Sequence, residues 1–90
     1  MYRVRRSDGR FVVTDESRCR RSILGRRFTV LPDLVSARGS ARRHASRAAG
    51  LVAHYRIEKY SPDALGWILI ENYRVEDRGH RVIVDGEVIN

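Results

Sequence analysis

The chain has 90 residues, of which 42% are hydrophobic and 8% aromatic, so it can bury one modest core and is too apolar for a disordered chain. We therefore expect a single domain over residues 1–90. No apolar run approaches the roughly 20 residues that cross a bilayer, and the first residues lack the apolar segment of a secretion signal. The only cysteine, Cys19, has no partner for an internal disulfide, which favours a cytoplasmic protein.

The net charge is +7, and it is unevenly distributed along the chain. The residues up to Arg47 carry a balance of +9, whereas the remainder carries −2. Apart from Lys59, every basic residue is an arginine, whose planar fork suits phosphates and carboxylates. The basic half therefore favours an acidic partner, although a GC-rich genome would also enrich arginine without any role in binding.

The first stretch, "YRVRRSDGRFVVTD", predicts a β-hairpin with a type I′ turn at Asp8-Gly9. In the register that this turn sets, Val4 pairs with Val13 and Arg6 pairs with Phe11. Arg3 and Arg5 then point to one face of the hairpin. The opposite face carries the apolar side chains of Tyr2, Val4, Phe11 and Val13.

The next stretch, "DESRCRRSILG", is compatible with a short helix that is capped by Asp15 or Ser17 and ends at Gly25. A basic loop is the alternative over residues 16–24. A short strand follows, with Phe28 and Val30 on the same side.

Asp33 then predicts the start of a helix over residues 34–49, which Gly50 ends. Small residues form a narrow stripe along this helix and would let it lie close against a sheet. The stripe consists of Leu34, Ala37, Ala41, Ala45 and Ala48.

The C-terminal half predicts a meander of strands. Residues 51–60 alternate, with Tyr55 and Ile57 on one face and His54 and Arg56 on the other, as in a half-buried antiparallel strand. After a loop at 61–66, the strand at 67–76 is expected to be buried on both faces over residues 67–70. A turn, the strand "RVIV", an Asp85-Gly86 turn and a last short strand complete the chain.

This order predicts an α+β fold: a two-layer sandwich in which one main helix packs on an antiparallel β-sheet, with an N-terminal β-hairpin. The other face of the sheet would be at least partly exposed and would offer a flat surface to a partner. A homodimer is also possible, because the core is small and the sheet has an open edge or face.

The arginines of the hairpin and the helix are the candidate binding residues. On the helix, two of them lie beside the alanine stripe and two lie on the opposite face. The charge therefore surrounds the helix, which favours phosphate contacts over base reading from one helix face and is also compatible with simple solvation. The candidates are Arg3, Arg5, Arg6, Arg10, Arg38, Arg42, Arg43 and Arg47.

No motif indicates catalysis, and we expect no catalytic residue, cofactor or metal. The three histidines, His44, His54 and His80, lack the spacing of metal ligands. A metal-independent nuclease remains an alternative, with proton donors and phosphate clamps from His54 and Arg56, or from Tyr73, Arg74 and His80.

From residue 28 the order is "FTVLPDLVSARGSARRHASRAAG", "LVAHYRIEKY" and "WILIENYRVE". This short strand, Ala/Arg-rich helix and strand pair resemble small phage-encoded anti-CRISPR proteins over about 50 residues. The resemblance implies a non-enzymatic inhibitor in the host cytosol that binds a nucleic-acid-handling, CRISPR-like complex. The partner would be a host protein or ribonucleoprotein complex, gripped at acidic protein surface or at guide-RNA phosphates. The alternative is a direct DNA- or RNA-binding protein or a small basic ribonuclease toxin.

Overall fold

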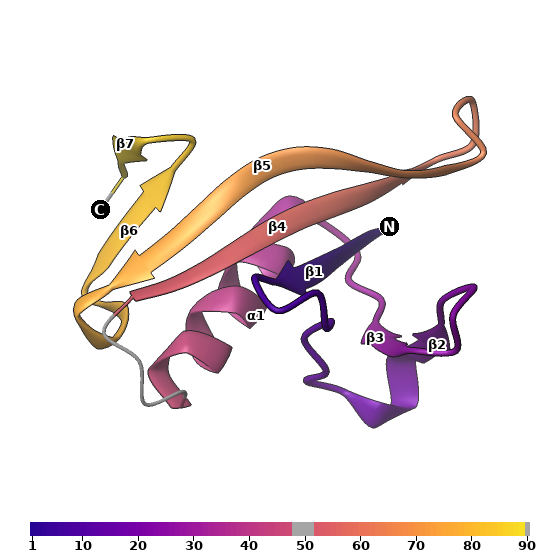
Figure 1. The fold of residues 1–90 in the computed structure, drawn as a ribbon, viewed down its shortest axis with the longest axis horizontal. Helices are drawn as coiled ribbons and strands as arrows, with labels where there is room; N and C mark the ends of the chain where they lie inside the picture. Colours follow the sequence, from indigo (N-terminus) through magenta and orange to yellow (C-terminus); the bar gives the residue numbers. More distant parts are fainter. Residues whose placement is uncertain (48–51, 90) are drawn as a thin grey trace.

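A computed structural model of the chain describes residues 1–47 and 52–89. One α-helix lies against a five-stranded antiparallel sheet, and a separate two-stranded hairpin packs beside them (Figure 1). The elements are β1 (Tyr2–Arg6), a 3₁₀ turn η1 (Glu16–Arg18), β2 (Cys19–Arg21), β3 (Arg27–Thr29), α1 (Leu34–Arg47), β4 (Val52–Ser61), β5 (Gly66–Glu76), a 3₁₀ turn η2 (Asp77–Gly79), β6 (Arg81–Val84) and β7 (Glu87–Val88).

The large sheet has the strand order β1-β4-β5-β6-β7, and all its pairs are antiparallel. Strands β4 to β7 follow each other along the chain as the predicted meander. β1 joins from the N-terminus by pairing with β4, so that Val4 lies opposite Ile57. The pairing of β4 with β5 shifts between Ile57 and Glu58, which is a β-bulge in the middle of the longest hairpin.

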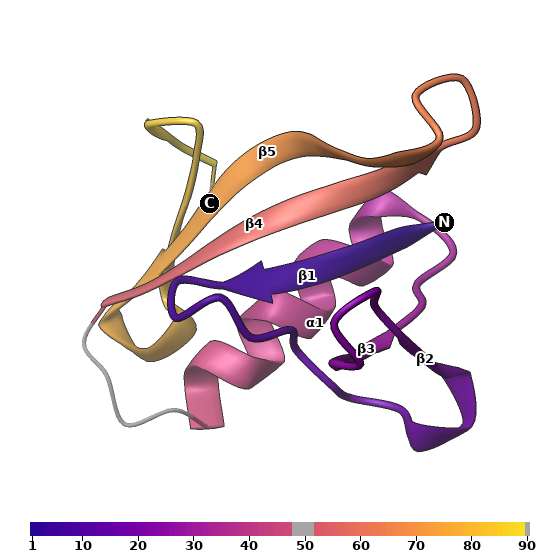
Figure 2. The same ribbon diagram turned by 45° about the vertical axis from the view of Figure 1, so that its right-hand side comes forward.

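The alanine stripe of the helix packs on one face of this sheet, and both ribbon views show α1 lying across β1, β4 and β5 (Figure 2). Ala37, Ala41 and Ala45 are almost completely buried. Asp33 caps the helix as expected, since its Oδ1 accepts a hydrogen bond from the Ser36 amide at 2.7 Å. The predicted α+β fold is confirmed. Ala48, the last residue of the predicted stripe, and Gly50, the predicted end of the helix, lie outside the described residues.

The core lies between this helix and the alternating inward side chains of the sheet. Its strand residues are Val4 on β1, Tyr55 and Ile57 on β4, and Tyr73 and Val75 on β5, all at most 4% exposed. Because successive side chains of a strand point to opposite faces, the residues between them must lie on the face away from the helix. That open face is the partly exposed sheet surface that the sequence predicts.

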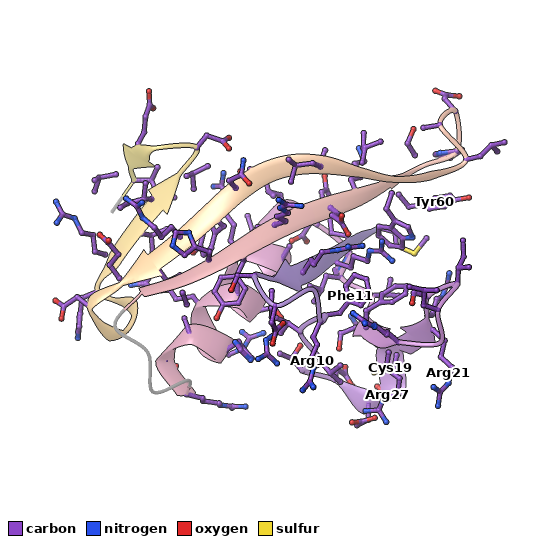
Figure 3. All side chains as sticks on the ribbon, viewed as in Figure 1. Arg10, Phe11, Cys19, Arg21, Arg27 and Tyr60 are labelled. Atoms are coloured by element: carbon purple, nitrogen blue, oxygen red, sulfur yellow. The ribbon has the colours of Figure 1, made fainter. Side chains whose placement is uncertain are left out.

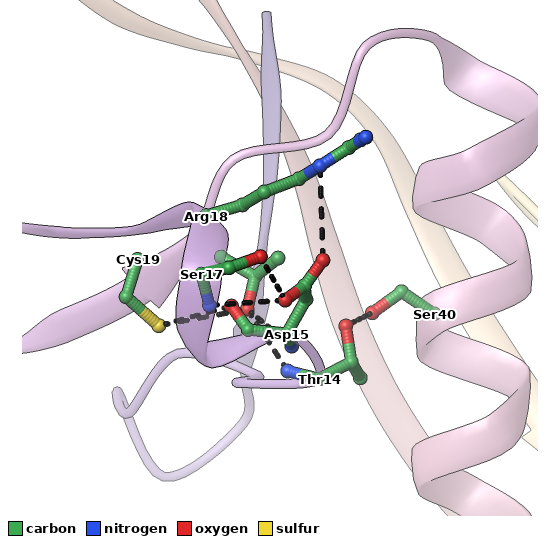
Figure 4. Close-up of polar contacts among 7 residues, drawn as sticks. Thr14, Asp15, Ser17, Arg18, Cys19 and Ser40 are labelled. Carbon is green, nitrogen blue, oxygen red and sulfur yellow. Dashed lines mark hydrogen bonds and ion pairs between the residues drawn. The ribbon is translucent and has the colours of Figure 1, made fainter.

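The stretch 16–24 is neither the short helix nor the plain loop that the sequence suggests. Asp15 does act as a cap, but only for the single turn η1, and the chain then forms the β2–β3 hairpin with Cys19 opposite Thr29. Side chains hold this hairpin to the rest of the fold (Figure 4). The Thr29 hydroxyl accepts hydrogen bonds from the Thr14 and Asp15 amides, and the Thr14 hydroxyl lies 3.4 Å from that of Ser40 on α1.

The N-terminal hairpin forms in a different register from the predicted one. Arg5, not Arg6, lies opposite Phe11, and only an isolated bridge joins the two arms. The reason is the turn. Gly9 has a positive φ of 84° but Asp8 does not, so the turn is not type I′ and the loop is one residue longer. The second Asp-Gly pair does form a type I′ turn, because Asp85 and Gly86 both have positive φ.

The expected burial of residues 67–70 on both faces is wrong. Ile68, Leu69 and Ile70 are 40%, 51% and 37% exposed. The tip of the β4–β5 hairpin extends past the helix, so α1 does not cover this end of β5 (Figure 1). Within the described residues, no helix combines the length and the apolar character needed to cross a membrane.

Candidate functional site

A basic groove of about 420 Å³ lies on the open face of the sheet. Arg5 enters it from β1, His54 and Arg56 from β4, and Asn72 and Arg74 from β5. Each of these side chains lies next to a core residue along its strand, which turns it away from the helix. Three neighbouring strands therefore place Arg5, Arg56, Arg74 and His54 around one hollow.

The register places two arginines opposite each other in this groove, since Arg5 lies directly opposite Arg56 across β1 and β4. On the other side of β4, His54 lies opposite Arg74 of β5. Opposed cations on one face of an antiparallel pair destabilise it, whereas a merely solvated face gains from opposite charges at such positions. An anion bound between the guanidinium groups would remove this repulsion.

Carboxylates neutralise the groove only in part. Arg5 Nε lies 3.6 Å from Glu58 and Arg74 Nε lies 3.7 Å from Glu76, which are ion-pair distances but too long for hydrogen bonds. Both Nε atoms are buried and have no hydrogen-bond partner in the part of the chain that the structure describes. Arg56 is exposed and has no ion pair within residues 1–47 and 52–89. The exposed Arg56 guanidinium therefore has donors that an incoming oxyanion can reach.

The turn of the N-terminal hairpin borders the groove. Arg6 also lines it, and its Nη2 pairs with Asp8 at 2.8 Å. The same carboxylate accepts a hydrogen bond from the Arg10 amide, which holds the pKa of Asp8 below its ordinary value. The Arg10 side chain is exposed and does not line the groove. Of the four hairpin candidates, Arg5 and Arg6 therefore lie at the groove.

Arg3 is a buried residue, only 6% exposed. Its guanidinium lies 4.3–4.9 Å from the ring centroids of Phe11, Phe28 and Trp67, and its Nε donates to Glu58 at 2.8 Å. Burial lowers the pKa of Arg3, and the hydrogen bond to Glu58 opposes that shift. These contacts make Arg3 a packing residue that joins β1 to the β2–β3 hairpin and to β5.

The four helix candidates lie apart from the groove. Arg38 makes a bidentate ion pair with Glu71, at 2.6 and 2.8 Å, and Arg42 donates to the Gly79 carbonyl at 3.0 Å. Arg43 and Arg47 line a separate hollow, together with Asp15 and with Arg18 of η1. The eight predicted arginines therefore do not form one surface.

The structure divides the residues proposed for a nuclease. His54 and Arg56 share the open face, but Tyr73 points into the core while its neighbour Arg74 points into the groove. His44 lies behind the sheet, where its Nδ1 is 2.7 Å from the Tyr55 hydroxyl. Burial lowers the pKa of His44 and raises the pKa of Tyr55 to about 12. Among the described residues, no group of histidine, cysteine and carboxylate side chains can hold a metal ion.

Sequence reasoning missed the central members of the groove as a binding set. The alternation of their strand predicts the outer face for His54 and Arg56. The only role that the sequence suggests for them is in the nuclease alternative, not in phosphate binding. The alternation of β4 and β5 was visible, but the opposition of Arg5 and Arg56 depends on the pairing of β1 with β4. That long-range register leaves no local signal in the sequence.

In comparisons with known proteins, no family model, no curated protein and no solved structure matches the chain.

Proposed function

We propose that the protein is a non-enzymatic binding protein that holds nucleic-acid phosphates on the open face of its sheet. The observation that carries the proposal is the direct opposition of Arg5 and Arg56, with the Arg56 charge unpaired within the described residues. Arginine forks bind phosphate oxygens with short, charge-assisted hydrogen bonds. A net charge of +7 adds long-range attraction to any polyanion.

The chemistry of the groove favours contact with the backbone over base recognition. Tyr55 and Tyr73 point into the core, so neither ring is a stacking platform for bases. The groove side chains of β4 and β5 are arginine, histidine and asparagine, which are suited to phosphate oxygens. Binding is therefore expected to depend on salt and to show little sequence preference.

Fluorescence anisotropy with labelled single-stranded RNA, single-stranded DNA and duplex DNA over a salt series tests this proposal. For a single strand, each phosphate contact contributes about 0.7 to the slope of log affinity against log salt. Arg56→Gln and Arg74→Gln should each lower the slope by about this amount and weaken binding to all sequences alike.

Lys59→Gln is the matched control, because it removes one charge from the same strand as Arg56 but lies against the Tyr2 ring and outside the groove. It should leave the slope nearly unchanged. An equal loss in Lys59→Gln and Arg56→Gln would mean that net charge alone drives binding. Absence of binding to all three nucleic acids at low salt would exclude the proposal.

The inhibitor role implied by the anti-CRISPR resemblance stays a prediction, as does the host protein or ribonucleoprotein partner. Affinity purification of the tagged protein with and without nuclease distinguishes an inhibitor of a protein complex from a direct nucleic-acid binder. A protein partner is still recovered after nuclease treatment, whereas bare nucleic acid is not. The ribonuclease alternative predicts that purified protein cleaves RNA and that His54→Ala abolishes the cleavage.

A further inference from the structure

We propose that a second groove, between the β2–β3 turn and the β4–β5 turn, docks an acidic peptide segment with apolar side chains from a partner protein. The groove measures about 430 Å³, within the range of sites that hold a few side chains. Residues of both hairpin turns line it, and Figure 1 shows these two turns projecting toward the same end of the molecule. The proposal goes beyond phosphate binding on the open sheet face.

Aromatic rings form the wall of this groove. Trp67 makes edge contacts with Phe28 and with Tyr60, at centroid distances of 5.3 and 5.5 Å, and Phe11 packs against Phe28 at 5.4 Å. In Figure 3, Tyr60 lies on one side of this region while Phe11 and Arg21 lie on the other. The contacts fix the rings, so the groove is formed before any partner arrives.

Exposed apolar side chains converge on the groove from both turns. Ile23 and Leu24, at the tip of the β2–β3 hairpin, are fully or largely exposed, and Leu65 at the tip of the β4–β5 hairpin is 86% exposed. Leu65 also has a φ of 51°, in the left-handed region where asparagine or glycine is usual. A strained, exposed leucine at a groove suggests a role outside the fold itself.

The charge of the groove specifies an acidic occupant. Arg21, Arg26 and Arg5 contribute to its lining, and no carboxylate does. Arg21 and Arg26 donate only to the Gly25 and Gly9 carbonyls, which leaves their charges without an acidic partner in the described chain. Apolar side chains of a peptide would fit the leucines and rings, while its carboxylates would meet these arginines.

The aromatic rings favour a peptide over nucleic-acid bases. The Arg3 guanidinium lies over the rings of Phe11, Phe28 and Trp67, so faces that a base would need are already covered. Ring edges and exposed leucines remain, and these suit aliphatic side chains. This groove therefore differs in chemistry from the groove on the open sheet face, whose described lining holds arginines but no exposed large apolar side chain.

The experiment selects binders from a displayed library of random peptides against the immobilised protein. Enriched peptides should combine aspartate or glutamate with leucine, isoleucine or phenylalanine. Because Trp67 is the only tryptophan, its emission reports binding at this groove directly. Leu24→Ser and Leu65→Asn should each weaken the selected peptide about tenfold or more, since each removes an apolar contact. Asparagine tolerates the left-handed backbone at position 65, which keeps that variant folded.

Val35→Ser is the control, because Val35 is also an exposed apolar residue but lies on α1 away from the groove. Its peptide affinity should match that of the wild type. Selection of basic peptides or of none, or equal binding by Leu24→Ser and wild type, would overturn the proposal. The same would follow if oligonucleotides, and not peptides, shifted the Trp67 emission. Arg56→Gln and Arg74→Gln should leave peptide binding unchanged, so failure of this proposal is distinguishable from failure of the phosphate site.

Discussion

Replacing Arg38 with alanine should destabilise the protein by about 2–3 kcal/mol. Arg38 joins the middle of α1 to the middle of β5 through its two hydrogen bonds to Glu71. The Glu71 side chain is only 6% exposed, whereas that of Arg38 is 35% exposed. The hydrogen bond to Glu71 also raises the pKa of Arg38, so the guanidinium stays charged at every accessible pH.

The magnitude follows from this unequal exposure. Breaking a fully buried pair leaves an uncompensated charge and costs about 3–5 kcal/mol, while an exposed pair contributes about 1 kcal/mol or less. Arg38→Ala leaves the buried Glu71 carboxylate without a cation. We therefore expect the loss in unfolding free energy to lie between the values for an exposed pair and for a fully buried pair. Glu71→Ala leaves a cation that can reach water, so it should cost only about 1 kcal/mol.

Urea denaturation followed by far-UV circular dichroism measures both losses. In a domain of this size, 2 kcal/mol corresponds to a fall in Tm of about 8–16 °C. Arg43→Ala is the control on the same helix, because Arg43 is exposed, and it should change stability by about 0.5 kcal/mol or less. A loss for Arg38→Ala no greater than that for Glu71→Ala would refute the reasoning, since burial of the carboxylate would then not set the cost.

Four further predictions concern single side chains. Leu65→Asn should raise the free energy of unfolding by about 1 kcal/mol, because the φ of 51° strains a leucine; chemical denaturation measures it. Stability should fall as the pH drops below about 6.5, because position 44 is protonated in the unfolded chain before the half-buried His44 of the folded protein is. It should fall again as the pH rises from about 10 through the pKa of Tyr55 near 12, because the unfolded tyrosine ionises first. Arg3→Lys should cost about 1 kcal/mol, since lysine keeps the charge but not the planar stack on three rings.

Each of these predictions has a control variant or an outcome that would contradict it. His44→Gln should remove part of the loss of stability below pH 6.5, and Tyr55→Phe should remove part of the loss above pH 10; an unchanged pH profile in either variant would contradict the assignment. If Leu65→Asn is less stable than the wild type, the leucine contributes more packing than strain. A fully stable Arg3→Lys variant would show that charge, and not stacking, holds the ring cluster.

The elements with a clear periodicity were predictable from the sequence. Ala37, Ala41 and Ala45 recur every four residues, and burial of these positions decides how the helix lies. The alternation around Tyr55 and Ile57 likewise fixed the inner face of β4. Local patterns were enough to predict the inner faces of α1 and β4, because each of these elements buries one face.

The rest depended on contacts between distant segments. The apolar run at residues 67–70 has the composition of a buried strand, but the length of the β4–β5 hairpin carries it past the helix. The short strand at Phe28 was predicted and is β3, but β2 has few apolar residues to signal a strand. For the candidate site, the arginines were recognised by type, but only the β1–β4 register distinguishes Arg5, which lines the groove, from Arg3, which is enclosed by rings.

The ring cluster around Arg3 has a consequence for the order of folding. Arg3 comes from β1, Phe28 from β3 and Trp67 from β5, while Phe11 follows the first turn of the chain. The cluster therefore forms only after segments far apart in the sequence have met. The β4–β7 meander needs only short connections and can form early, whereas docking of β1 and the β2–β3 hairpin closes long loops. Trp67 lies where these two parts join. In a stopped-flow refolding experiment, its emission should therefore follow the late docking step, while far-UV circular dichroism follows the earlier formation of the meander.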